Sequence, residues 1–157
     1  MTLLRPGDRF PTLKITPPGA DPVAVPELFD GRWGVVLFFR GAWCPYCVAQ
    51  LRAFQRASDT LSATGIAVAA TSVEDESVTA DLVARHRVAF PVGHSADAAA
   101  VAEHTGAFVN PDPVYLQSTG FVLDPRSAVA ISVYSSGAIG RLVPEDVAAL
   151  VRYLRDH

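Results

Sequence analysis

An apolar segment that ends shortly before a pair of cysteines constrains this chain more than any other feature. Trp33–Phe39 is a continuous apolar run, and Cys44-Pro45-Tyr46-Cys47 follows after four further residues. A short apolar run without alternation predicts a strand buried on both faces. Pro45 suits the first position of a helix, where its missing N–H leaves no hydrogen bond unmade. The sequence therefore places the two cysteines at a junction between a buried strand and a helix.

These cysteines are the only two in the chain, and their C-x-x-C spacing predicts a redox site. A thiolate in the first turn of a helix meets unpaired N–H groups and the positive end of the helix dipole, and both lower its pKa. The second thiol lies one turn further on, within reach of a disulfide bond. A C-x-x-C can also form half of a zinc site, but the chain has no second cysteine pair and no pair of histidines at ligand spacing. We therefore expect neither a metal nor a cofactor.

Length and charge narrow the class of function. The 157 residues predict a single domain, 1–157, and the net charge of −3 without a basic stripe argues against nucleic-acid binding. The first residues lack the apolar stretch of a signal peptide, and no apolar run approaches the roughly 18 residues that span a bilayer. We therefore expect a cytoplasmic protein without a membrane partner. In such a reducing compartment a C-x-x-C favours a catalytic or sensing pair over a structural disulfide.

The rest of the sequence alternates strand-like and helix-like segments. The predicted strands are Leu13–Ile15, Val23–Val25, Val35–Phe39, Ile66–Val73, Phe90–Val92, Gly120–Asp124 and Ala128–Tyr134. The predicted helices run from Pro45 to about Thr64, from Ser77 to about Arg87, over Asp97–His104, and from Pro144 with Val147, Leu150, Val151 and Leu154 on one face. This order predicts an α/β, thioredoxin-like fold, with a central mixed β-sheet flanked by helices on both faces.

The segment Phe38–Cys47, followed by Gln50-Leu51, resembles the peroxiredoxin-like branch of the AhpC/TSA (redoxin) family. Further likenesses extend the resemblance over nearly the whole chain, at Arg5–Pro11, Val88–Ala102 and Thr119–Pro125. The resemblance implies an antioxidant oxidoreductase, a thiol-dependent peroxidase that reduces a peroxide through Cys44 and Cys47. It also implies an external thiol reductant, either a thioredoxin-like protein or a low-molecular-weight thiol, and it allows a homodimer.

Three positions depart from the family pattern. Peroxiredoxins carry Pro-x-x-x-[Thr/Ser]-x-x-Cys around the reactive cysteine; with Cys47 in that role, Arg40 stands at the proline position and Cys44 at the threonine position. The arginine that precedes the Gly120–Asp124 strand in the family is absent, because a glutamine and a serine stand there. The sequence therefore leaves two further functions open: a thiol–disulfide oxidoreductase that acts on protein or small-molecule disulfides, and a non-catalytic redox sensor.

The identity of the attacking cysteine is also open. Cys47 shares a helix face with Leu51 and Phe54, which predicts that it is buried and reacts second. Cys44 lies at the start of the helix, which predicts a more exposed thiol of lower pKa and favours it as the nucleophile. The peroxiredoxin register indicates the reverse order.

Three residues next to the cysteines are candidates for binding a substrate. Arg40 lies at the end of the buried strand, where its charge would favour a thiolate or bind an oxygen substrate. Trp43 would either shield the disulfide and shape a partner surface or belong to the core. Tyr46 lies between the cysteines, and we expect it to be exposed.

More distant residues are also candidates for the site. In a thioredoxin layout the loop that carries Gln117, Ser118 and Thr119 would face the C-x-x-C, so Ser118 and Thr119 are candidate substrate contacts. His94 is a further residue that could approach the cysteines. The acidic run Glu74–Glu76 is interpreted as a solvated loop and helix start, where negative charge is favourable.

Overall fold

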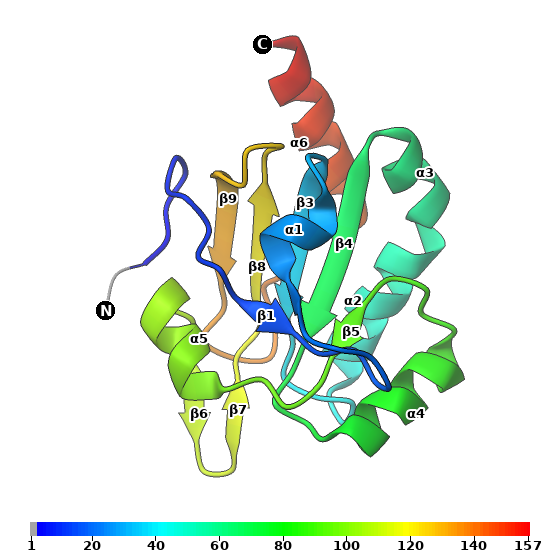
Figure 1. Cartoon of the computed structure of the whole chain (residues 1–157), viewed down its shortest axis with the longest axis vertical. Coiled ribbons are helices and arrows are strands. Elements are labelled where there is room, and N and C mark those ends of the chain that lie inside the picture. Colours follow the sequence, from blue (N-terminus) through cyan, green and yellow to red (C-terminus); the bar gives the residue numbers. More distant parts are fainter. Residues whose placement is uncertain (1–2) are drawn as a thin grey trace.

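The apolar run Trp33–Phe39 supplies the central strand of a five-stranded sheet in the computed structural model, which describes residues 3–157. The strand order is β5-β4-β3-β8-β9 (Figure 1). The bounds are Trp33–Phe38 for β3, Ile66–Thr71 for β4, Val92–Gly93 for β5, Thr119–Leu123 for β8 and Val129–Tyr134 for β9. β3 and β5 run parallel to β4, whereas β8 runs antiparallel to both β3 and β9, so the sheet is mixed as predicted.

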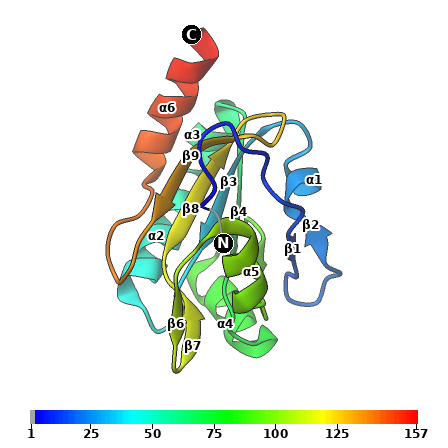
Figure 2. The same cartoon turned by 90° about the vertical axis from the view of Figure 1, so that its left-hand side faces the viewer.

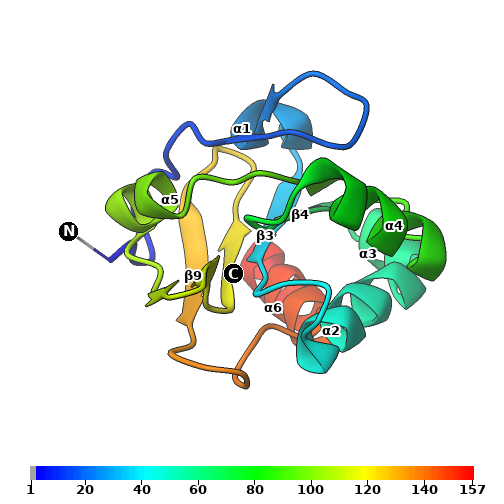
Figure 3. The same cartoon turned by 90° about the horizontal axis from the view of Figure 1, so that it is seen from below.

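Two apolar cores pack against opposite faces of this sheet, because successive side chains of a strand point to opposite sides. Val35 and Leu37 of β3 belong to the first core, and Val36 and Phe38 to the second. The first core is completed by α2 (Pro45–Arg56), α3 (Ser58–Ala63), α4 (Glu76–His86) and α6 (Pro144–Asp156). The second is completed by β1 (Lys14–Ile15), α1 (Val25–Phe29) and α5 (Ala98–Thr105). Figures 2 and 3 show α2 and α6 on one side of the sheet and α1 and α5 on the other, which confirms the predicted layers.

Two of the predicted helices differ from those observed. The predicted helix from Pro45 to Thr64 is two helices, α2 and α3, which meet at Ala57. The three residues after Ala57 are Ser, Asp and Thr, whose side chains compete with the helix backbone for hydrogen bonds. In α6 the predicted apolar position Leu154 is exposed, because the end of this helix extends beyond the sheet (Figure 1). No helix within residues 3–157 has both the length and the apolar character needed to cross a membrane.

Three short elements are absent from the sequence-based prediction. Helix α1 begins at Val25, so the predicted strand Val23–Val25 shortens to β2 (Val23–Ala24), which pairs with β1. The segments β6 (Val109–Pro111) and β7 (Val114–Leu116) form an antiparallel hairpin. Two prolines interrupt this hairpin segment and hide its strand pattern. The other predicted elements are present, with bounds shifted by one or two residues.

One edge of the sheet gathers four segments of the chain. Phe38 at the end of β3 lies opposite Thr71 at the end of β4 and opposite Thr119 at the start of β8. Thr119 in turn lies opposite Tyr134 at the end of β9. The loops that follow β3, β4 and β9 therefore meet the loop that precedes β8. Sites in α/β proteins form outside the carboxyl ends of parallel strands, and the C-x-x-C opens α2 at this edge.

Replacing Phe54 with alanine tests how strongly the first core depends on α2. The Phe54 ring is fully buried in that core, so its removal loses apolar burial and leaves a cavity. We expect the free energy of unfolding to fall by about 3–5 kcal/mol in urea denaturation. Arg52→Ala, on the exposed face of the same helix, is the control and should change it by less than about 0.5 kcal/mol. Equal losses in the two variants would contradict this packing.

Candidate active site

Cys44 and Cys47 lie together at the N-terminus of α2. Cys44 is the N-cap residue, and its Sγ accepts a hydrogen bond from the backbone N–H of Cys47 at 3.3 Å. The two sulfurs are 2.6 Å apart, with the Cys47 thiol as donor, and both cysteines are free thiols. The helix start therefore positions the pair for disulfide formation, as its spacing predicts.

Both sulfurs are buried, which corrects one expectation. Cys44 and Cys47 are each 0% exposed, so the prediction that Cys44 is the more exposed thiol is wrong. Cys44 belongs to the first core, and the Arg40 side chain folds back over it, with Nη1 3.7 Å from its Sγ. The start of a helix is usually exposed, and the sequence does not show that the Arg40 side chain folds over Cys44.

The surroundings move the pKa values of the two thiols in opposite directions. Burial alone raises the pKa of Cys44, but hydrogen bonds from the Cys47 thiol, the Cys47 N–H and Arg40 together outweigh it, so this pKa is lowered. Burial also raises the pKa of Cys47, and the adjacent Cys44 sulfur raises it further, against the nearby Arg141 guanidinium and a hydrogen bond from the Arg40 backbone N–H. The pKa of Cys47 is therefore raised. Cys44 is the thiol that deprotonates first.

Arg40 connects the thiol pair to the loop before β8. Its Nε donates to Gln117 Oε1 at 3.1 Å and its Nη2 donates to the hydroxyl of Tyr115 at 3.1 Å. Its backbone N–H also approaches Cys47 Sγ at 3.4 Å. The guanidinium is thus held between the Cys44 sulfur and two side chains that arrive more than seventy residues later in the chain.

The aromatic residues of the C-x-x-C segment lie at the surface. Trp43 is 54% exposed, so its alternative as a core residue is wrong; its ring centroid lies 4.9 Å from the Arg40 guanidinium carbon. Gly41 makes room for it, because a Cβ on Gly41 would overlap the Trp43 indole nitrogen. Tyr46 is exposed, as expected for a residue between the cysteines.

The loop before β8 reaches the site through one residue of the three considered. Gln117 contacts Arg40, as described above. Ser118 and Thr119 are buried, and their recorded hydrogen bonds are structural: the Ser118 carbonyl accepts from the Ser135 N–H, and the Thr119 hydroxyl donates to the Gln117 carbonyl. Their assignment as substrate contacts stays a prediction.

Arg141, in the loop between β9 and α6, is a residue of the site that the sequence analysis did not single out. Its positive charge lowers the pKa of Cys44, and the same guanidinium opposes the rise in the pKa of Cys47. Its Nη2 donates to the Ala138 carbonyl at 2.5 Å, while Nε and Nη1 are buried without a hydrogen-bond partner among the described residues. The one sequence signal is a single cation at the end of the small-residue run Ser135–Gly140.

Glu74 supports the loop that leads into the C-x-x-C. Its Oε1 accepts a hydrogen bond from the Ala42 N–H at 2.7 Å, and the residue is half-buried rather than solvated as expected. Burial raises the pKa of Glu74, although the bond from Ala42 opposes the shift. The neighbouring Asp75 caps α4 through the Val78 N–H at 3.0 Å, as expected for the start of a helix.

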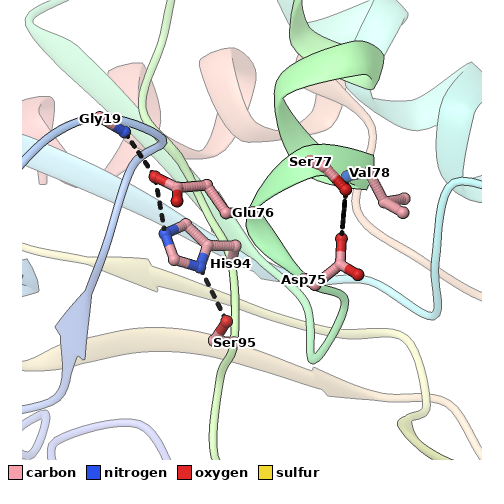
Figure 4. Close-up of polar contacts among 7 residues, drawn as sticks. All are labelled: Gly19, Asp75, Glu76, Ser77, Val78, His94 and Ser95. Atoms are coloured by element: carbon pink, nitrogen blue, oxygen red, sulfur yellow. Dashed lines mark hydrogen bonds and ion pairs between the residues drawn. The ribbon is translucent and has the colours of Figure 1, made fainter.

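His94 belongs to a separate polar cluster, shown in Figure 4. Its Nδ1 lies 2.8 Å from Ser95 Oγ and its Nε2 lies 3.7 Å from Glu76 Oε2, which also accepts from the Gly19 N–H at 2.8 Å. These contacts join the loop after β1 to the start of α4. In the part of the chain that the structure describes, no recorded polar contact of His94 involves the cysteines.

A groove of about 280 Å³ lies next to the thiol pair and begins at Tyr46. Ala49 and Ala53 of α2 form one wall, and residues 139–144 form the other. Gln50 joins the walls, because its Nε2 donates to the Leu142 carbonyl at 3.0 Å. Across residues 3–157 no group of three or more His, Cys, Asp or Glu side chains is arranged to hold a metal ion.

Comparison with known proteins assigns the family. The model of the AhpC/TSA family matches residues 6–131. The chain belongs to the AhpC/TSA family. A curated peroxiredoxin from Methanothermobacter thermautotrophicus is 25% identical over 157 residues, covering 95% of this chain and 72% of that protein.

Two solved structures share the fold of this chain. Peroxidoxin BcpB from Mycobacterium tuberculosis matches with a TM-score of 0.84 at 17% identity, covering 97% of this chain and 99% of that chain. Reduced Prx3 from Vibrio vulnificus in complex with H2O2 matches with a TM-score of 0.81 at 19% identity, covering 95% and 99%. These matches confirm the predicted thioredoxin-like fold. Family membership confirms the predicted enzyme class, an oxidoreductase of the thiol-dependent peroxidase type.

Glu74 variants test the support of the active-site loop. Glu74→Ala leaves the Ala42 N–H without its partner, so we expect the free energy of unfolding to fall by about 1–2 kcal/mol at neutral pH. Glu74→Gln keeps an acceptor oxygen. Because burial raises the folded-state pKa of Glu74, the proton-linked part of its stabilisation is fully present below the unfolded pKa and is lost as pH rises through the folded pKa. The hydrogen bond from the Ala42 N–H remains after this loss, because the ionised carboxylate still accepts it. Glu74→Gln should therefore lose less stability than the parent chain between acid and neutral pH in urea titrations; identical pH profiles would contradict this role.

Arg141 variants test whether the charge of this second guanidinium lowers the pKa of Cys44. Arg141→Met removes a charge that lowers the pKa of Cys44, so the midpoint of Cys44 alkylation by iodoacetamide should move to higher pH. Alkylation below neutral pH then slows severalfold, because less thiolate is present. Arg141→Lys keeps the charge, so its alkylation midpoint should lie between those of the parent chain and Arg141→Met. Unchanged alkylation in Arg141→Met would show that this charge does not act on the pair.

Proposed function

We propose that the chain is a single-domain thiol peroxidase in which Cys44 attacks the peroxide and Cys47 resolves the product. The observation that carries this proposal is the opposite shift of the two thiol pKa values within a pair whose sulfurs are 2.6 Å apart. The thiolate is the reactive form, and Cys44 is the thiol whose pKa the site lowers. The peroxiredoxin register would assign attack to Cys47, whose raised pKa argues against it.

The reaction uses the two electrons of the thiol pair. The Cys44 thiolate attacks one peroxide oxygen, the O–O bond breaks, and the other oxygen leaves as water or an alcohol after taking a proton from solvent. Cys44 becomes a sulfenic acid. The Cys47 sulfur then attacks the Cys44 sulfur, the S–O bond breaks, and the hydroxyl group leaves with the Cys47 proton as water. The product is the Cys44–Cys47 disulfide.

Arg40 and Arg141 stabilise the charges in this sequence. Arg40 Nη1 already donates toward the Cys44 sulfur, and the same guanidinium is placed to bind a peroxide oxygen next to it. A guanidinium from the end of β3 thus serves where the family places an arginine before β8. The Vibrio vulnificus Prx3 structure, which holds H2O2, supports a peroxide as the substrate class.

An external thiol must reduce the disulfide again after each turnover. Either a thioredoxin-like protein or a low-molecular-weight thiol can serve, and the yeast mitochondrial 1-Cys peroxiredoxin, another similar structure at 19% identity, is resolved through glutathione and thioredoxin systems. The need for a reductant favours a reducing compartment such as the cytoplasm. The exposed Trp43 and Tyr46 next to the pair are the surface on which such a reductant, or a second copy of the chain, would dock.

Stopped-flow oxidation by hydrogen peroxide tests the proposal. The reduced chain should react orders of magnitude faster than free cysteine, with Trp43 fluorescence as the reporter. Cys44→Ser should abolish this fast phase. Cys47→Ser should keep one fast turnover and accumulate a sulfenic acid that dimedone traps at Cys44. A fast phase that Cys47→Ser abolishes and Cys44→Ser keeps would reverse the assignment.

A second assay, the reduction of insulin disulfides, separates the two alternative functions. If peroxide reacts no faster than with free cysteine, reduction of insulin disulfides would identify a thiol–disulfide oxidoreductase. The exposed Trp43 and Tyr46 favour this as the second candidate, because they offer an apolar surface to a protein substrate. If neither activity is present and the disulfide still forms reversibly, the chain is a redox sensor.

A further inference from the structure

The β6–β7 hairpin lies next to the thiol site and has no role in the function described so far. Val109 pairs with Leu116 and Asn110 with Tyr115 across its strands. The Asn110 side chain donates to the Pro113 carbonyl at 2.7 Å and closes the turn. At the base of the hairpin the Gln117 N–H donates to the Phe108 carbonyl at 2.9 Å. Hydrogen bonds therefore fix the hairpin at its turn and at its base, which restricts the movement of its side chains.

Tyr115 is the residue through which the hairpin reaches the site. Its hydroxyl accepts the hydrogen bond from Arg40 Nη2 at 3.1 Å, and its ring centroid lies 5.2 Å from the Arg40 guanidinium carbon. Its ring also packs edge to face on Trp43, with the centroids 5.0 Å apart. Arg40 therefore contacts two aromatic rings that also contact each other, so both restrict the same guanidinium.

The N–H groups of Arg40 show what this restriction achieves. A guanidinium carries five N–H donors in a fixed plane. Three of them are directed to Gln117, Tyr115 and the Cys44 sulfur. Within residues 3–157 no hydrogen bond uses the other two donors, one on each terminal nitrogen. With Nε and Nη2 held by oxygens, the plane cannot rotate, and Nη1 stays on the Cys44 side.

We propose that Tyr115 is a positioning residue, which the β6–β7 hairpin holds in place so that the Arg40 guanidinium stays against the Cys44 sulfur with donors free for a peroxide oxygen. A long arginine side chain otherwise samples many rotamers, and each one that leaves the sulfur removes the cation from the thiolate. Tyr115 restricts these rotamers without touching a sulfur. The inference rests on the proposed role of Cys44 as the attacking thiol.

Two substitutions separate the contributions of the hydroxyl and the ring. Tyr115→Phe removes the hydrogen bond and keeps the ring, and we expect alkylation of Cys44 below neutral pH to slow by about threefold. Tyr115→Ala removes both contacts, and we expect alkylation of Cys44 below neutral pH to slow by about tenfold. In each variant the midpoint of alkylation against pH should move upward. Tyr153→Phe, on the exposed side of α6, is the matched control and should leave the profile unchanged.

A double-mutant cycle tests whether Tyr115 acts through Arg40. In an Arg40→Met background, Tyr115→Ala should have no further effect on alkylation, since no guanidinium remains to be positioned. An equal slowing in both backgrounds would overturn the proposal, as would an unchanged profile in Tyr115→Ala. If Tyr115→Ala fails to fold, Tyr115→Phe and its cycle with Arg40→Met decide the question.

Alkylation keeps this test independent of the peroxidase proposal. Iodoacetamide reports on the thiolate without any peroxide, and mass spectrometry identifies Cys44 as the modified residue. A shifted alkylation profile without fast peroxide reduction would retain the positioning role and reject the peroxidase function. If Tyr115→Ala changes neither fast peroxide reduction nor the alkylation profile, the peroxidase function is retained and the positioning role of Tyr115 is rejected.

Discussion

The pairing of β3 with its two neighbours is the constraint on which the site depends. Phe38 at the end of β3 lies opposite Thr71 in the parallel direction and opposite Thr119 in the antiparallel direction, and Thr119 lies opposite Tyr134. Because these registers align one end of each strand, loops from four parts of the chain meet around the start of α2. A register slip of one residue in β8 would turn its side chains to the other face of the sheet and displace the loop that contacts Arg40.

The buried thiol pair needs the groups that these loops bring to the start of α2. Burial in an apolar core disfavours a thiolate, so a reactive Cys44 requires hydrogen bonds and positive charge close to its sulfur. The helix start supplies the Cys47 N–H, and Arg40 and Arg141 supply charge from the end of β3 and from the loop after β9. Where the AhpC/TSA pattern expects a proline and a threonine, this chain has Arg40 and Cys44. The proline position therefore carries a cation, and the threonine position carries the proposed nucleophile.

Sequence reasoning predicted most of the architecture and about half of the site. It placed the central strand, the helix opened by the C-x-x-C and the buried position of Cys47, because each depends on residues a few positions apart. It missed the β6–β7 hairpin, whose strands are short and interrupted by prolines, and with it Tyr115. It expected Cys44 to be exposed, because the side chain that covers it, Arg40, folds back over the helix start only in the assembled site.

The sequence by itself determined the spacing of the two thiols, their place at the start of a helix and the apolar strand before them. These are local properties, since a C-x-x-C on a helix brings its sulfurs together wherever the helix lies. Only the tertiary structure placed the charged and hydrogen-bonding groups that lower the pKa of Cys44 against burial and leave the pKa of Cys47 raised. Segments far apart in the chain supply these groups: Arg141 brings charge to the pair, Tyr115 and Gln117 hold Arg40, and Glu74 holds the Ala42 N–H. Strand pairing brings these segments together. Electrostatic interactions depend on distance in space, which the order of residues along the chain does not specify.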